Sequence, residues 1–274
     1  MKANHQWLKQ ISKLGLLMLM GVSMSADAGL FGIGGASWKE EVLLHDGRKL
    51  IVERAQTRAG RHEIGQDVPV AKHTVSFSLP GKDKPITWES EFGLEVEKSS
   101  LNMLALDVVG GVPYIVATST GCIAYNKWGR PNPPYVLFKF DGKVWQRIPL
   151  AEFPTAIKEA NVAIGALTLR EEKVLTGHSG PVSVEEVRKM NAEGQTPEYR
   201  YLRVFVREPV KSAQTTDCAE MVYDGNGGWL GIDWFTSQPT YEACLKLCER
   251  KKISAQFCPC NRLFGSKLKG SASI

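Results

Sequence analysis

Six cysteines constrain this chain more than any other feature, because four of them lie close together near the C-terminus. Cys244 and Cys248 are four residues apart, which places them on one face of a helix with Cβ atoms about 6 Å apart. Cys258 and Cys260 are two residues apart, which in an extended segment places them on the same side about 6.6 Å apart. The two pairs therefore have similar spacings, so each cysteine of one pair can lie opposite a cysteine of the other.

A reversal of the chain between the two pairs determines which cysteines meet. We expect the turn at 251–256, and we expect 257–261 to be extended because Pro259 disfavours a helix at the preceding residue. Six cysteines allow many connectivities, so the pairing is a hypothesis. The predicted disulfides are Cys248–Cys258, Cys244–Cys260 and, by elimination, Cys122–Cys218.

A four-cysteine zinc site is the alternative for the C-terminal cysteines. Zinc modules usually have two close pairs with about two to four residues between the members of each pair, and Cys258-Pro259-Cys260 is tight for that geometry. A redox-active pair is not predicted, because no C-x-x-C motif is present. Disulfides are favoured if the chain reaches an oxidising compartment.

The first 28 residues are typical of an export signal. Lysines at positions 2, 9 and 13 precede an apolar stretch at 14–24, and Ala26-Asp27-Ala28 offers small residues at the two positions that signal peptidase reads. The apolar stretch is about half of the roughly 20 residues that a membrane-spanning helix needs, which disfavours an uncleaved anchor. We therefore expect a periplasmic or secreted mature chain without a transmembrane segment.

The positive charge of the chain is concentrated at its C-terminus. The formal net charge is +5, and the segment 241–274 carries seven Lys or Arg against two Glu. We interpret this segment as a solvated basic surface; weak contact with an anionic surface is the alternative. Nucleic acid is not an expected partner. Hydrophobic residues make up 43% of the chain, which is sufficient for a substantial core.

Short strands separated by turn signals run along the rest of the chain. Asp46-Gly47, for example, supplies the positive φ that a tight hairpin needs. The segment 135–140 alternates imperfectly, which indicates a strand buried on both faces. We expect a first group of four strands at 41–44, 49–53, 74–78 and 85–89, a second group at 101–108, 113–117, 135–140 and 144–148, and later strands at 163–169, 199–207, 219–223 and 229–234.

Two helices are expected among these strands. Ser183 and Glu186 form the sequence pattern of a capping box, which begins the first helix. The second opens at Pro239 and Thr240 and runs through Arg250.

These elements predict a mainly β fold: an antiparallel sandwich or partly open barrel with one or two short helices and a disulfide-linked helical tail. The predicted organisation is a signal at 1–28, a flexible Gly-rich N-terminus at 29–37, an antiparallel β domain at 38–235 and a basic Cys-rich tail module at 236–274.

Motifs of known chemistry fail on their context. Gly32–Gly35 has no preceding strand for a phosphate loop, and Gly177–Pro181 has Pro where a serine nucleophile elbow needs Gly. Asp224–Gly228 lacks the acidic twelfth residue of a calcium loop. A site assembled from His62, Glu63, His73 and a distant acid stays open as an alternative to scattered histidines. We therefore predict no catalytic residue, metal ligand or cofactor.

The segment 122–135 is the most distinctive part of the chain. Aromatic and basic side chains are held there by three prolines between two strands, as in a rigid recognition loop for a peptide or a glycan. The alternative is a covered corner, in which Trp128 and Tyr125 pack beneath the loop while Cys122 pins one end. The candidate binding residues are Tyr125, Lys127, Trp128, Arg130 and Tyr135.

The segments 38–48 and 125–135, taken together, resemble a group of exported proteins of proteobacteria that have no assigned activity. The resemblance covers roughly residues 38 to 150. It implies a periplasmic setting and offers no catalytic residue to carry over. We expect a non-catalytic binding or envelope-associated module whose partner is a protein or glycan of the cell envelope. The alternative is an envelope hydrolase whose site is assembled from separate strands.

Overall fold

The computed structural model describes residues 35–59, 65, 67–68, 70–82, 84–91, 101–164, 168–193 and 197–270. The predicted signal at 1–28 lies outside these residues, as do His62 and Glu63. Strand β1 begins at Gly35, so residues 35–37 of the predicted flexible N-terminus belong to a sheet.

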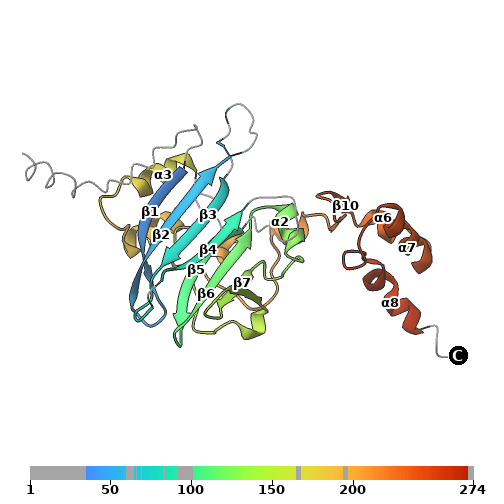
Figure 1. Ribbon diagram of the computed structural model, residues 1–274, viewed down its shortest axis with the longest axis horizontal. Coiled ribbons are helices and arrows are strands. Elements are labelled where there is room, and N and C mark those ends of the chain that lie inside the picture. The colour runs from blue at the N-terminus through green and yellow to red at the C-terminus, as the bar shows by residue number, and fades with distance from the viewer. Residues whose placement is uncertain are drawn as a thin grey trace, which may run out of the picture. The chain divides into compact units, whose positions relative to one another are not determined.

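The first expected group of four strands forms one antiparallel sheet in the order β1-β2-β3-β4 (Figure 1). The β1–β2 hairpin closes through a hydrogen bond from the Leu44 N–H to the Arg48 carbonyl, and Gly47 adopts a φ of 84° in the turn. This confirms the hairpin predicted from Asp46-Gly47. The strands are β1 (Gly35–Leu43), β2 (Lys49–Arg58), β3 (Val70–Phe77) and β4 (Ile86–Glu91).

The second expected group also forms an antiparallel sheet, in the order β5-β6-β7-β8. Strand β7 is buried on both faces, as predicted: Val136 and Phe138 belong to one hydrophobic cluster, whereas Leu137 belongs to another. The strands are β5 (Leu101–Val109), β6 (Val112–Ser119), β7 (Val136–Phe140) and β8 (Trp145–Ile148).

The two sheets share a hydrophobic core and remain open, so they do not close into a barrel. Trp88 of β4 contacts Phe138 of β7 edge to face, with 6.0 Å between the ring centroids. At the junction of the sheets, the Ser90 hydroxyl accepts a hydrogen bond from the Leu101 N–H and donates one to the Leu101 carbonyl. The predicted fold class is confirmed.

The other face of the second sheet is covered by η1 (Leu150–Glu152) and by η2 (Pro197–Leu202) with the residues that follow it. The strand expected at 199–207 is therefore wrong. Its apolar residues, such as Tyr201 and Phe205, pack on the outer face of this sheet, and only an isolated bridge between Glu159 and Val204 is present.

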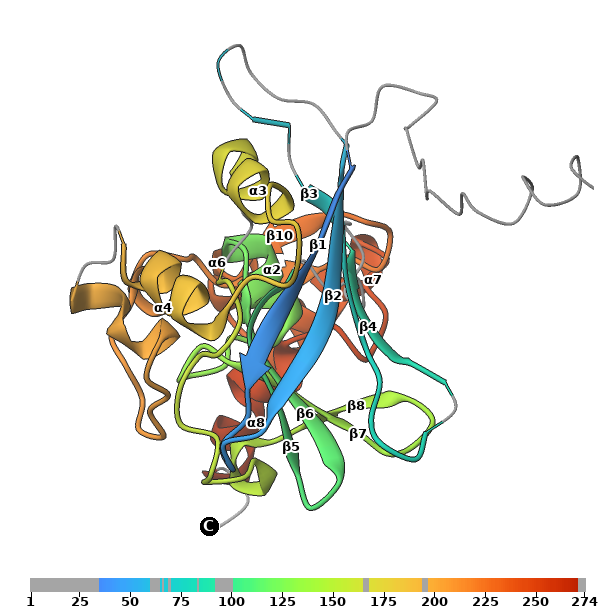
Figure 2. The same ribbon diagram turned by 90° about the vertical axis from the view of Figure 1, so that its left-hand side faces the viewer.

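Two helices pack beside β1: α3 (Leu169–Thr176) and α4 (Val184–Ala192) (Figure 2). The capping box that begins α4 is confirmed. The strand expected at 163–169 is wrong, because Thr168 caps α3 through a second capping box with Glu171. Residues 165–167 are outside the described part of the chain.

The C-terminal region contains a hydrophobic cluster of its own and the two closely spaced disulfides. This cluster includes Val222 and Phe235, which precede residue 236, so the predicted domain boundary stays a prediction. The remaining elements are α2 (Cys122–Lys127), α5 (Ala213–Thr216), β9 (Met221–Tyr223), β10 (Trp229–Gly231), α6 (Asp233–Thr236), α7 (Tyr241–Arg250) and α8 (Cys260–Gly270).

Helix α7 begins where Thr240 caps it, as predicted. The extended segment expected at 257–261 is wrong, because α8 begins at Cys260. Pro259 precedes that helix, where its missing N–H removes no helical hydrogen bond. The strand expected at 229–234 ends at Gly231, since α6 follows it. Among the residues described, no helix has the length and apolar character needed to cross a membrane.

Candidate functional site

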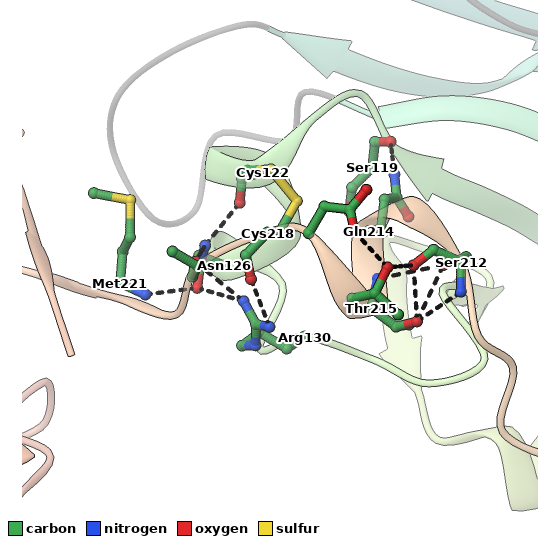
Figure 3. The surroundings of a disulfide bond; sticks show 12 residues. Ser119, Cys122, Asn126, Arg130, Ser212, Gln214, Thr215, Cys218 and Met221 are labelled. Atoms are coloured by element: carbon green, nitrogen blue, oxygen red, sulfur yellow. Dashed lines mark hydrogen bonds between the residues drawn. A yellow bond between two sulfur atoms is a disulfide. The ribbon is translucent and has the colours of Figure 1, made fainter. Parts of the chain in front are cut away.

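The predicted recognition segment begins with a helix rather than an extended loop. Helix α2 starts at Cys122, whose Sγ forms a disulfide with Cys218 across 96 residues of sequence (Figure 3). The pairing expected by elimination is therefore confirmed. Nearby, the Gln214 side-chain amide of α5 donates a hydrogen bond to the Ser119 carbonyl at the end of β6. The disulfide and this hydrogen bond connect both ends of one segment, 214–218, to residues 119–122.

Two side chains of the segment 122–135, those of Asn126 and Arg130, hold the chain that follows Cys218. The Asn126 amide donates hydrogen bonds to the carbonyls of Cys122 (2.9 Å) and Ala219 (3.0 Å), and its oxygen accepts from the Met221 N–H (2.9 Å). The Arg130 guanidinium donates to the carbonyls of Cys218 (2.9 Å) and Ala219 (3.2 Å). Residues 218–221 are thus fixed by both a covalent bond and a group of hydrogen bonds, as Figure 3 shows. We call this arrangement the cystine corner.

The five candidate binding residues are mostly engaged inside the protein. Tyr125 is only 2% exposed and lies beneath the Arg130 guanidinium, which is 5.0 Å from its ring centroid. Lys127 and Tyr135 are buried, and Trp128 is partly buried against Phe138. These positions match the covered-corner alternative. A direct contact of the five residues with a ligand stays a prediction.

Tyr135, at the end of the segment 122–135, binds the chain at 201–206, which covers the outer face of the second sheet. Its hydroxyl donates to the Tyr201 carbonyl (2.7 Å) and accepts from the Val206 N–H (3.2 Å). Burial raises the pKa of Tyr135 to about 12. The phenol therefore stays protonated at neutral pH and acts as a structural hydrogen-bond donor.

An open groove of about 390 Å³ lies beside Tyr135, between the residues at 131–133 and those at 147–150. Pro131, Pro133 and Pro149 line it, together with Leu150 and other apolar side chains, and Arg147 adds a cation. The adjoining Asn132 side chain is fixed, because its oxygen accepts from the Val210 N–H (2.7 Å) and its amide donates to the Val210 carbonyl (3.1 Å). We call this feature the proline groove. A rigid wall of this kind loses little entropy when a ligand binds.

A buried ionic cluster, which sequence reasoning missed, lies on the inner face of the first sheet. The Arg54 guanidinium donates to Glu40 Oε1 (3.1 Å), to His73 Nε2 (3.1 Å from Nε) and to the Ala163 carbonyl (2.6 Å). Burial, together with the nearby Arg54 charge, holds the pKa of His73 well below its usual range. Because Arg54 and Glu40 are completely buried, the cluster has no exposed group to offer a substrate.

A second histidine pairs with a carboxylate nearer the surface. His45 Nδ1 lies 2.7 Å from Asp107 Oδ1, and the His45 N–H donates to Asp107 Oδ2 (3.0 Å). The His45 side chain is 23% exposed, whereas that of Asp107 is 4% exposed. This pair joins the β1–β2 turn to β5 and is the arrangement that a catalytic histidine would need. The turn signal at His45-Asp46-Gly47 located the hairpin but not the partner.

The C-terminal cysteines are oxidised in the structure. Cys244 pairs with Cys260 and Cys248 with Cys258, as predicted from their spacing. Three of the Sγ atoms, from Cys248, Cys258 and Cys260, lie within 4.8 Å of one another, which would suit a metal only after reduction.

Comparisons with known proteins return no match. No protein-family model, no curated protein and no solved structure matches the chain.

Proposed function

We propose that this chain is an exported, disulfide-stabilised binding module of the cell envelope with no catalytic role, and that its ligand site is the proline groove. The observation that carries the proposal is the fixed wall of the groove, because the Asn132 side chain makes two hydrogen bonds with Val210 and Pro131 directly follows Arg130 of the cystine corner. Preorganisation of this kind reduces the ordering cost of binding.

The chemistry of the groove favours a peptide over a glycan. Its walls are proline and aliphatic side chains, which suit apolar peptide side chains, and Arg147 would attract a carboxylate on the same ligand. Sugar rings usually stack on exposed aromatic faces. Tyr135, which lines the groove, is only 5% exposed, and Trp128, whose ring lies beneath the Arg147 guanidinium, packs against Phe138.

Peptide selection on the oxidised protein tests this proposal. Peptides chosen from a displayed library would be measured by titration calorimetry against the wild type, Arg147→Ala and the control Arg188→Ala. Arg188 is exposed and lies outside the groove, and its guanidinium is 3.7 Å from the Glu159 carboxylate. We expect acidic, apolar peptides that lose about tenfold in affinity with Arg147→Ala and are unaffected by the control. Selection of no peptide, or equal affinity for both variants, would contradict the proposal.

The second candidate function is an envelope hydrolase, and the His45–Asp107 pair favours it. In that case His45 would act as a general base, with Asp107 orienting its ring. Purified protein would be assayed with ester, glycoside and peptide substrates, and then again as His45→Gln and His178→Gln. Turnover that disappears only in His45→Gln would replace the binding proposal with the hydrolase.

A further inference from the structure

A second cleft lies between the turns that join three pairs of strands, and it shares no lining residue with the proline groove. Its volume is about 660 Å³, within the range of roughly 300 to 1,000 Å³ typical of small-molecule sites. It is lined by the β3–β4 turn, the β5–β6 turn at Gly111 and the β7–β8 turn at Gly142, which Figure 2 shows near one end of the sheets. We call it the hairpin cleft.

The described residues of the turns around the hairpin cleft have defined conformations. Gly110 and Gly111 both have positive φ, at 60° and 78°, as a two-residue hairpin turn requires. In the β3–β4 turn, the Lys82 N–H donates a hydrogen bond to the Leu79 carbonyl (3.1 Å), and Gly81 has a φ of 74°. The cleft is therefore shaped by the backbone before any ligand binds.

The lining of the hairpin cleft is amphipathic. Ile86 is buried, and Leu79 and Phe140 are partly buried and pack against the core of the two sheets. Lys82 and Lys84 are exposed residues of the lining. Apolar and basic residues thus line the same space.

The cleft is lined by three lysines and, among the described residues, by one carboxylate, that of Asp141. Asp141 accepts hydrogen bonds from the N–H groups of Lys143 and Val144, both at 2.8 Å, and from the Gln146 amide at 2.7 Å. The two backbone hydrogen bonds, from Val144 and Lys143, hold the pKa of Asp141 below its ordinary value, so its carboxylate stays ionised and offsets one of the three lysine charges. Within the described residues, no ion pair involves any of the three lysines that line the cleft, Lys82, Lys84 and Lys139.

We propose that the hairpin cleft binds a single amphiphilic anion, with its head group on the lysines and its apolar chain on the lining formed by Ile86, Leu79 and Phe140. Charge complementarity selects the head group, and affinity increases with the number of methylenes that the apolar lining buries. The site is independent of the proline groove, so failure of either proposal leaves the other standing.

Titration calorimetry with dodecyl phosphate below its micelle concentration tests this proposal. The protein would be the mature chain with its disulfides intact. We expect dodecyl phosphate to bind more tightly than octyl phosphate, and inorganic phosphate or dodecyl maltoside to bind at least about tenfold more weakly, because each provides only one of the two chemistries.

Matched triple variants locate the binding. Lys82→Ala/Lys84→Ala/Lys139→Ala should lose about tenfold or more in affinity. The control Lys173→Ala/Lys189→Ala/Lys211→Ala removes the same charge from exposed positions outside the cleft and should retain wild-type affinity. Equal losses in the two variants would overturn the site. Binding to phosphatidylglycerol vesicles without binding of monomeric dodecyl phosphate would also overturn it, in favour of a membrane surface.

Discussion

The two-sheet body and the C-terminal cluster are stabilised by different means. Sixteen buried residues form the core that the two sheets share, and none of them is a cysteine. The C-terminal cluster has seven, of which three are cysteines. A small cluster removes less apolar surface from water, and disulfides compensate by restricting the unfolded chain.

The two-sheet body and the C-terminal cluster also differ in whether they bury charged side chains. The body contains Arg54 and Glu40 at 0% exposure, whereas none of the charged side chains described between residues 221 and 265 is buried. Burial of an ion pair has a large desolvation cost, which a substantial core can offset. A cluster of seven buried residues offers much less apolar burial for this purpose.

The largest expected effect comes from the disulfide that links the first residue of α2 to the chain before β9. The variant Cys122→Ala/Cys218→Ala should lower the free energy of unfolding by about 4 to 5 kcal/mol, because the bond closes a long loop. Urea denaturation of oxidised wild type and variant measures this. A loss below about 1 kcal/mol would mean that the Asn126 and Arg130 hydrogen bonds suffice to hold the corner.

The buried ion pair is the next largest effect. Arg54→Met leaves Glu40 buried without its cation and should lower the free energy of unfolding by about 3 to 5 kcal/mol. The double variant Arg54→Met/Glu40→Leu removes both charges and should be more stable than Arg54→Met alone. Denaturation of the two variants checks this order, and the reverse order would contradict a coupled pair.

Loss of one C-terminal disulfide should act locally. Cys244→Ala/Cys260→Ala opens a short loop, for which we expect about 3 kcal/mol. Amide exchange should then increase in α7 and α8 while β1–β8 keep their protection. Equal loosening of both regions would mean that the C-terminal cluster and the body unfold as one unit.

The smallest effect is the pH dependence that His73 gives to the body. Its pKa is lowered in the folded state, so below pH 6.5 the unfolded chain takes up a proton that the folded chain does not. Stability should be fully present above this pH and fall as pH decreases, by at most about 1.4 kcal/mol per pH unit. His73→Gln should flatten this slope and His178→Gln should not, as measured by denaturation between pH 4.5 and about 7.5.

Much of the fold could be predicted from local signals. Turn residues and alternation located both four-stranded groups, and cysteine spacing identified the disulfides although 257–261 is not extended. The strand expected to end at Glu53 continues to Arg58, because Arg54 and Arg58 are buried by ionic partners rather than by apolar side chains. A period-two hydrophobic pattern cannot detect such burial.

The sites were harder to predict, because they depend on contacts between distant residues. Glu40 and Arg54 meet across paired strands, and His45 and Asp107 are 62 residues apart. The aromatic residues of the segment 122–135 are visible in the sequence, but the burial of Tyr125 depends on Arg130 and on the chain near Cys218. The hairpin cleft likewise appears only when three turns come together.

Peptide mapping of the exported protein is the most direct test of the central claim, a disulfide-stabilised module of the envelope. Protein purified from the periplasm would be alkylated with and without reduction, and its N-terminus and cross-links would be identified by mass. We predict a chain that begins at Gly29 with the pairs Cys122–Cys218, Cys244–Cys260 and Cys248–Cys258. A retained N-terminal segment, or four alkylatable C-terminal thiols with bound zinc, would contradict this account.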